Sequence, residues 1–136
     1  MIDSLEKYVS ILESDDNNVR RIAATSDTSV EVWKDILSRR PDLAFEVAMN
    51  KQLPKSVIDI LIQNNNADVR CTVAMKRSLD SLQCEILAKD AEDSVRIMIA
   101  NNKKTPVSLL ELLQNDSCNR VSLAASNQLR NRRTGD

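Results

Sequence analysis

Residues 95–113 read VRIMIANNKKTPVSLLELL, and this stretch holds one complete copy of a unit that the rest of the chain repeats. An apolar segment of helical periodicity is followed by a polar turn, a Thr-Pro pair and a leucine-rich segment. When the unit is slid along the chain, one residue type recurs at intervals of 24, 26, 26 and 24 residues: Ala24, Ala48, Ala74, Ala100 and Ala124. A fixed period of this length indicates a repeat protein.

Each repeat is predicted to contain two short helices, with one more helix, over residues 5–13, preceding the first repeat. The first helix of the repeats is expected at residues 19–25, 43–49, 69–75, 95–101 and 119–125. The second helix begins at a capping residue or a proline, namely Thr28, Pro54, Asp80 or Pro106. It ends at a pair of aliphatic residues, Ile36-Leu37, Ile60-Leu61, Ile86-Leu87 or Leu112-Leu113. Isolated helices this short barely form in water, so we predict an all-α fold, a short α-solenoid of about five stacked two-helix repeats.

Length and end sequences suggest one domain without a membrane segment. The 136 residues fit a single α-solenoid domain over residues 1–129, followed by a basic C-terminal tail over residues 130–136. No apolar run approaches the roughly 18 residues that span a bilayer, and no secretory signal is visible at the N-terminus. We therefore expect a cytoplasmic protein that does not associate with membranes, as a monomer or a weak dimer.

The residues that are missing argue against an enzyme. The chain has no histidine, which is the commonest general base and metal ligand. The only glycine is Gly135, so a glycine-rich phosphate loop cannot be built. The three cysteines, Cys71, Cys84 and Cys118, are scattered, which favours free thiols over a disulfide or a zinc site. We expect no catalytic activity, no cofactor and no metal.

The pattern Val-Arg-x-x-Ile-Ala-x-Asn-x-x-Thr-Pro-x-x-Leu-Leu of residues 95–110 resembles the leucine-rich-repeat-variant motif, a relative in style of HEAT repeats. Residues 69–74 and 19–24 are similar to its first half, and Asn50 with Pro54 to part of the second. The resemblance implies a right-handed superhelix in which one helix of each pair is close to 3₁₀ geometry. The founding protein of that family carries an iron-sulfur module, and three scattered cysteines do not fit one.

Four arginines occupy one position of the aligned repeats, four residues before the repeated alanine. A charged group beside a packing surface needs a partner, and aspartates precede the first helix of each repeat at Asp16, Asp42, Asp68, Asp93 and Asp116. The resemblance to HEAT-like repeats, which commonly link successive repeats in this way, implies a structural Asp-Arg ladder; the alternative is a row of arginines that binds a partner. This arginine column consists of Arg20, Arg70, Arg96 and Arg120, with Ala44 as the exception.

Four carboxylates occupy one position of the second helices, almost opposite the apolar stripe and therefore facing solvent. Like charges stacked on neighbouring helices create a negative potential that a basic partner would relieve. The acidic column is either a partner-binding surface or merely a solvated face. It consists of Asp35, Asp59, Glu85 and Glu111, with Glu31 adding to it. Trp33 shares the apolar stripe of its helix and is expected in the core rather than at a contact surface.

The favoured function is non-catalytic protein binding. Most concretely, we expect a small cytosolic inhibitor or immunity-type protein that binds a basic partner, such as a nuclease toxin, through the acidic helix surface. The alternative is a HEAT-like nucleic-acid-binding protein that uses a basic rim formed by Lys51, Lys76, Arg77, Lys103 and Lys104. The net charge of -1, the pI near 5.5 and the 2% aromatic content make nucleic-acid binding the weaker prediction.

Overall fold

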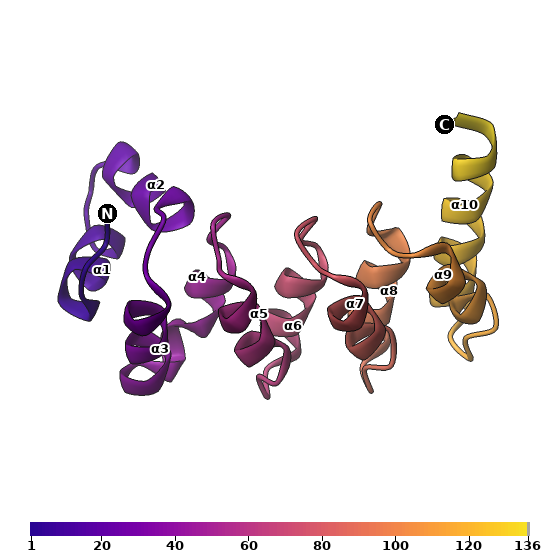
Figure 1. Cartoon of the computed structure of the whole chain (residues 1–136), viewed down its shortest axis with the longest axis horizontal. Helices are drawn as coiled ribbons and strands as arrows, with labels where there is room; N and C mark the ends of the chain where they lie inside the picture. The colour runs from indigo at the N-terminus through magenta and orange to yellow at the C-terminus, as the bar shows by residue number, and fades with distance from the viewer. Residues whose placement is uncertain (136) are drawn as a thin grey trace. The chain divides into compact units, whose positions relative to one another are not determined.

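The computed structural model describes residues 1–135, and within that range every regular element is helical. The predicted all-α class is confirmed. The helices, labelled in Figure 1, are α1 (Leu5–Leu12), α2 (Asn17–Thr25), α3 (Val30–Arg39), η1 (Pro41–Leu43), α4 (Ala44–Ala48), α5 (Lys55–Ile62), α6 (Ala67–Ala74), α7 (Ser81–Ala88), α8 (Asp93–Asn101), α9 (Val107–Leu113) and α10 (Asn119–Gly135).

The chain divides into two compact units, Met1–Gln63 and Asn64–Asp136, here called the N-terminal unit and the C-terminal unit. In the C-terminal unit α8 packs between α6 and α10, and these three helices form layer A; α7 packs against α9, and these two form layer B. In the N-terminal unit α2 and α4 form layer A, while α1, α3 and α5 form layer B. Within each unit the first helices of the repeats therefore pack together, and so do the second helices (Figure 1). The right-handed superhelix stays a prediction.

Burial patterns fix the alignment of the repeats and correct its last step. Val95 and Ile99 of α8 are completely buried, and the equivalent buried residues of α10 are Val121 and Ala125, each 26 residues later. The last repeat therefore aligns two residues later than the match of Ala100 with Ala124 predicts, and Ala124 itself is only partly buried. Ser126 stands at the position of the alanine column.

Most predicted helix starts are close, although the capping groups differ in detail. Asp80 and Gln83 form the reciprocal capping box of α7 that their spacing predicts. At α3 the cap is Ser29, whose hydroxyl accepts a hydrogen bond from the Val32 N–H, while the predicted cap Thr28 is buried. Pro54 and Pro106 precede the first helical residue as N-caps.

The 3₁₀ geometry implied by the resemblance is confined to one place. Among residues 1–135 only η1 is a 3₁₀ helix, and it leads directly into α4. The layer A helices α2, α6, α8 and α10 are α-helical, so that expectation is wrong for most repeats.

In each aliphatic pair that ends a layer B helix, one residue is buried and the other stays accessible to solvent. Leu61, Leu87 and Leu113, the second members, are buried. The first members remain accessible: Ile60 is 41% exposed, Ile86 42% and Leu112 64%. In α3 the order is reversed, because Ile36 is buried and Leu37 is partly exposed.

Trp33 lies in the core of the N-terminal unit, as its place in the apolar stripe predicts. It is fully buried and meets the Tyr8 ring edge to face, with ring centroids 5.5 Å apart. Burial, and to a lesser extent the Glu46 carboxylate, raises the pKa of Tyr8. The phenol therefore stays protonated, and neither it nor the Trp33 N–H has a hydrogen-bond partner among the described residues.

None of the helices in the described part of the chain is long and apolar enough to cross a membrane.

Neighbouring residues of one aliphatic pair test this account of the core. Leu87→Ala should lower the free energy of unfolding by about 2–5 kcal/mol, because it removes a fully buried side chain and leaves a cavity. Ile86→Ala, the matched control on the exposed face of α7, should cost much less. Urea denaturation of both variants gives the comparison, and equal losses would contradict the assigned register.

Candidate functional site

All five predicted acidic residues lie on exposed faces of layer B helices. Glu31 and Asp35 are on α3 and Asp59 is on α5, in the N-terminal unit. Glu85 on α7 and Glu111 on α9 lie on two helices that pack against each other in the C-terminal unit. Their exposure leaves each carboxylate accessible to another molecule.

Cations on the same helices partly neutralise this column. Arg39 Nη1 lies 3.0 Å from Asp35 Oδ2, and Arg39 Nη2 lies 3.1 Å from Glu6 Oε1. Lys89 Nζ lies 3.3 Å from Glu85 Oε1. The Asp35 and Glu85 pairs have the i,i+4 spacing, so the sequence alone gave their signal. All of these side chains are substantially exposed, and such pairs contribute little stability.

An aliphatic residue directly follows the acid at all four positions of the column, but Ile36 after Asp35 is buried. The other three, Asp59-Ile60, Glu85-Ile86 and Glu111-Leu112, are here called the acid–aliphatic pairs. Both members of each pair are exposed. Leu82, one turn before Ile86 on α7, is exposed as well. Sequence reasoning missed this apolar surface because it used each aliphatic pair only to mark the end of a helix and did not separate its exposed member from its buried one.

The two layer B helices of the C-terminal unit border an open groove of about 310 Å³. Glu85 and Ser81 of α7 line one side, and Ser108, Leu109 and Leu112 of α9 line the other, with Pro106 at the start of α9. The groove therefore combines an apolar lining with one carboxylate.

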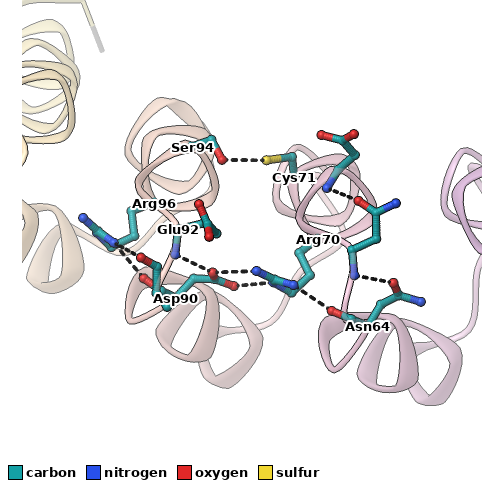
Figure 2. Close-up of polar contacts among 10 residues, drawn as sticks. Asn64, Arg70, Cys71, Asp90, Glu92, Ser94 and Arg96 are labelled. Carbon is teal, nitrogen blue, oxygen red and sulfur yellow. Dashed lines mark hydrogen bonds and ion pairs between the residues drawn. The ribbon is translucent and has the colours of Figure 1, made fainter.

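Two members of the arginine column, Arg70 and Arg96, form ladder rungs, and Figure 2 shows the rung between Arg70 and Asp90. Arg70 Nε and Nη2 lie 2.7 and 3.1 Å from the two carboxylate oxygens of Asp90. Arg96 binds Asp116 in the same bidentate way, at 2.8 and 3.1 Å. Each guanidinium also donates its remaining Nη1 to a carbonyl six residues earlier, Arg70 to Asn64 at 2.7 Å and Arg96 to Asp90 at 2.8 Å.

The carboxylates of the rungs also order the connectors. Asp90 Oδ1 accepts the Glu92 N–H at 2.9 Å, and Asp116 Oδ1 accepts the Cys118 N–H at 2.9 Å. Hydrogen bonds from Arg96 lower the pKa of Asp116. Burial acts to raise the pKa of Asp90, but hydrogen bonds from Arg70 and the Glu92 N–H outweigh it and the pKa is lowered. Both carboxylates therefore stay ionised.

The ladder includes an aspartate that was not among the predicted ones. Asp116 is a rung as expected, but the partner of Arg70 is Asp90, and the predicted Asp42 is held by Arg40 at 2.8 Å. Asp93 lies three residues beyond Asp90, inside the first turn of α8.

Arg20 and Arg120 are not rungs among the described residues. Arg20 donates to the Ser14 carbonyl at 2.6 Å and to the Asn17 side chain, both within its own repeat. Arg120 is exposed and forms no ion pair with any residue that the structure describes. In the corrected alignment its column position belongs to Ser122, whose hydroxyl donates to the Gln114 carbonyl at 2.7 Å.

Two buried asparagines hold the turns between layer A and layer B. Asn102 Nδ2 donates to the Ala74 and Lys76 carbonyls of the preceding repeat, both at 2.8 Å, and its Oδ1 accepts the Lys104 N–H at 2.9 Å. Asn50 makes the equivalent bonds to Ala23, Ser26 and Gln52, at 2.8, 3.0 and 2.7 Å. Only the resemblance to the leucine-rich-repeat-variant motif singles out these asparagines in the sequence, and the pattern of charged residues does not indicate them.

The predicted basic tail begins inside α10, which extends to Gly135; residue 136 lies outside the described residues. Arg132 donates to the carbonyls of Thr105 and Lys103 at 2.6 and 2.7 Å. This guanidinium is therefore engaged within the C-terminal unit.

The three thiols are free, and no group of three or more metal-ligating side chains gathers within residues 1–135. Comparison with family models, with curated proteins and with solved structures finds no match to this chain. Functional inference therefore rests on the acidic column, the acid–aliphatic pairs and the groove.

Asp116→Asn tests the ladder, because asparagine can still accept the Cys118 N–H while the ion pair with Arg96 is lost. The free energy of unfolding at pH 7 should fall by about 1–3 kcal/mol. The folded-state pKa of Asp116 is lowered, so its stabilisation is present above the unfolded value of about 3.9 and lost as pH falls through the folded-state pKa. The variant should therefore lose less stability on acidification than the parent, as measured by urea denaturation at several pH values.

The control for this experiment is Asp42→Asn, which breaks the exposed Arg40–Asp42 pair. It should change stability at pH 7 far less than Asp116→Asn. A similar effect of the two substitutions, or an unchanged pH profile for Asp116→Asn, would contradict the structural role of the rung.

Asn102→Ala should lower the free energy of unfolding by several kcal/mol, because the Ala74 and Lys76 carbonyls and the Lys104 N–H lose their partner, at about 1–3 kcal/mol for each group left unsatisfied in the interior. Its exposed neighbour gives the control, Asn101→Ala, which should be nearly neutral. Thermal and urea unfolding of the pair measure the difference. Indistinguishable stabilities would show that the asparagine bonds are not structural.

Proposed function

We propose that the chain is a non-catalytic protein-binding module whose contact residues lie on the exposed layer B faces of its two units, each unit taken by itself. The observation that carries the proposal is the set of acid–aliphatic pairs, each with an exposed carboxylate beside an exposed aliphatic side chain. Aliphatic side chains that stay exposed gain little from folding in water, and apolar patches of this kind are typical of binding surfaces.

The composition of this surface specifies the partner's chemistry. Aliphatic side chains such as Ile86 and Leu112 supply area that is removed from water on binding. Carboxylates such as Glu85 and Glu111 favour partners with lysine and arginine at the facing positions and disfavour acidic ones. We therefore propose a basic protein partner.

The concrete form we propose is a small inhibitor or immunity-type protein that neutralises a basic protein such as a nuclease toxin. Support comes from the exposed carboxylates of the acidic column, whose negative charge favours a basic partner. The affiliation with leucine-rich-repeat-variant and HEAT-like repeats is likewise a proposal. It is supported by the rungs at Arg70 and Arg96 and by the asparagines at Asn50 and Asn102.

Several arginines that would favour nucleic acid are engaged elsewhere. Arg70 and Arg96 bind carboxylates, and Arg132 binds backbone carbonyls. This leaves the basic turns, such as Lys103 and Lys104, with fewer cooperating cations, and we propose protein binding over nucleic-acid binding for that reason.

The partner is first isolated by affinity capture and identified. Combining Asp59→Lys with Glu85→Lys should then abolish binding of this partner, because both substitutions place a cation opposite the partner's cationic side chains. Thermal stability should change little, since both residues are exposed. Calorimetric titration with the purified partner measures affinity, and thermal unfolding measures folding.

The matched control reverses two exposed acids of the turns, Asp15→Lys with Asp27→Lys, and keeps the same net charge change. It should retain binding within a few-fold. If the layer B double variant binds as tightly as the parent, the acidic column is only a solvated face and the proposed function fails.

A further inference from the structure

The groove between α7 and α9 has two chemically different parts. Its apolar part comes from Leu109, which is 8% exposed, and from Leu112 and Pro106. Its polar part comes from the Glu85 carboxylate and the hydroxyls of Ser81 and Ser108. A ligand that fits both parts needs an apolar stem that ends in a cation with several N–H groups.

We propose that this groove binds an arginine side chain of the partner, an inference that rests on the proposed function and specifies how the surface recognises its target. Arginine lays its methylene stem along apolar surface while keeping the guanidinium at a polar group. The stem packs on Leu109 and Leu112, and the guanidinium meets Glu85. The volume of about 310 Å³ suits one long side chain.

The ion pair between Lys89 and Glu85 does not prevent an arginine side chain from replacing Lys89 at the Glu85 carboxylate. Lys89 holds Glu85 through one N–O contact of 3.3 Å, and its side chain is largely exposed. Such an i,i+4 surface pair contributes little. A guanidinium instead forms two parallel hydrogen bonds to a carboxylate, which is the stronger arrangement. The serine hydroxyls can accept its remaining N–H groups.

The test titrates the whole protein with Nα-acetyl-arginine methylamide at constant ionic strength and follows the backbone amide signals by NMR. Saturable shifts should appear at Ser81, Glu85, Ser108 and Leu112. The citrulline analogue has nearly the same shape but no charge, and it should bind at least about tenfold more weakly because the charge-assisted bonds are lost. Shifts without saturation, shifts elsewhere only, or equal binding of the citrulline analogue would overturn the proposal.

Two variants assign the effect to the carboxylate. Glu85→Gln should weaken arginine binding by about tenfold or more while keeping the shape of the groove. Lys89→Gln removes the competing cation and should bind the probe as tightly as the parent or more tightly. A weakening by Lys89→Gln as large as that by Glu85→Gln would contradict the geometry, because Lys89 would then be part of the site rather than a competitor.

Failure of this inference can be separated from failure of the proposed function. If the arginine probe does not bind but Asp59→Lys with Glu85→Lys still abolishes partner binding, the arginine groove is wrong and the protein-binding function stands. If the probe binds at Glu85 but the double reversal leaves partner binding intact, the groove is a cation site and the proposed partner surface is wrong.

Discussion

In the C-terminal unit, a bidentate contact joins an arginine of one layer A helix to an aspartate in the connector that precedes the next layer A helix. The C-terminal unit depends on this interaction most. Helices of seven to nine residues, such as α6 to α9, are too short to be stable alone, so each must be held by its neighbours. Hydrophobic burial at Val95 and Ile99 supplies the attraction but has little directional preference. The rung from Arg96 to Asp116 supplies direction, because two parallel hydrogen bonds and a third to the Asp90 carbonyl fix the connector relative to the helix.

The buried asparagines fix the turns at the opposite ends of the layer A helices. Asn102 satisfies two carbonyls of the preceding repeat and one N–H of its own turn, so a single buried amide links two turns. In layer B, α7 and α9 each bury one face in the packing of the unit. The opposite faces of α7 and α9 remain available, and they carry the acid–aliphatic pairs and the groove.

Sequence periodicity predicted the helices because apolar residues recur every three or four positions, and it predicted exposure of the acidic column for the same reason. Periodicity does not predict which residue is buried where two neighbouring residues are equally apolar. Nothing in Ile86-Leu87 says which side chain faces inward, and only the packing of α7 on α8 and α9 decides it. The alignment slipped at Ala124 in the same way, since alanine is small enough to suit both a buried position and a partly exposed one. Pairing within the ladder depends on the path of each connector, and a shift of three residues from Asp93 to Asp90 is beyond what spacing specifies.

A double-mutant cycle on Arg96 and Asp116 measures how strongly the rung contributes to folding. Arg96→Met, Asp116→Asn and the combined variant are compared with the parent by urea denaturation at pH 7, and the coupling free energy is taken from the four stabilities. We expect a favourable coupling of about 1–3 kcal/mol for this mostly buried pair, whereas a parallel cycle on the exposed Arg40 and Asp42 should show no measurable coupling. Additive effects of the Arg96 and Asp116 substitutions would contradict the account, because the connectors would then be held by something other than the rung.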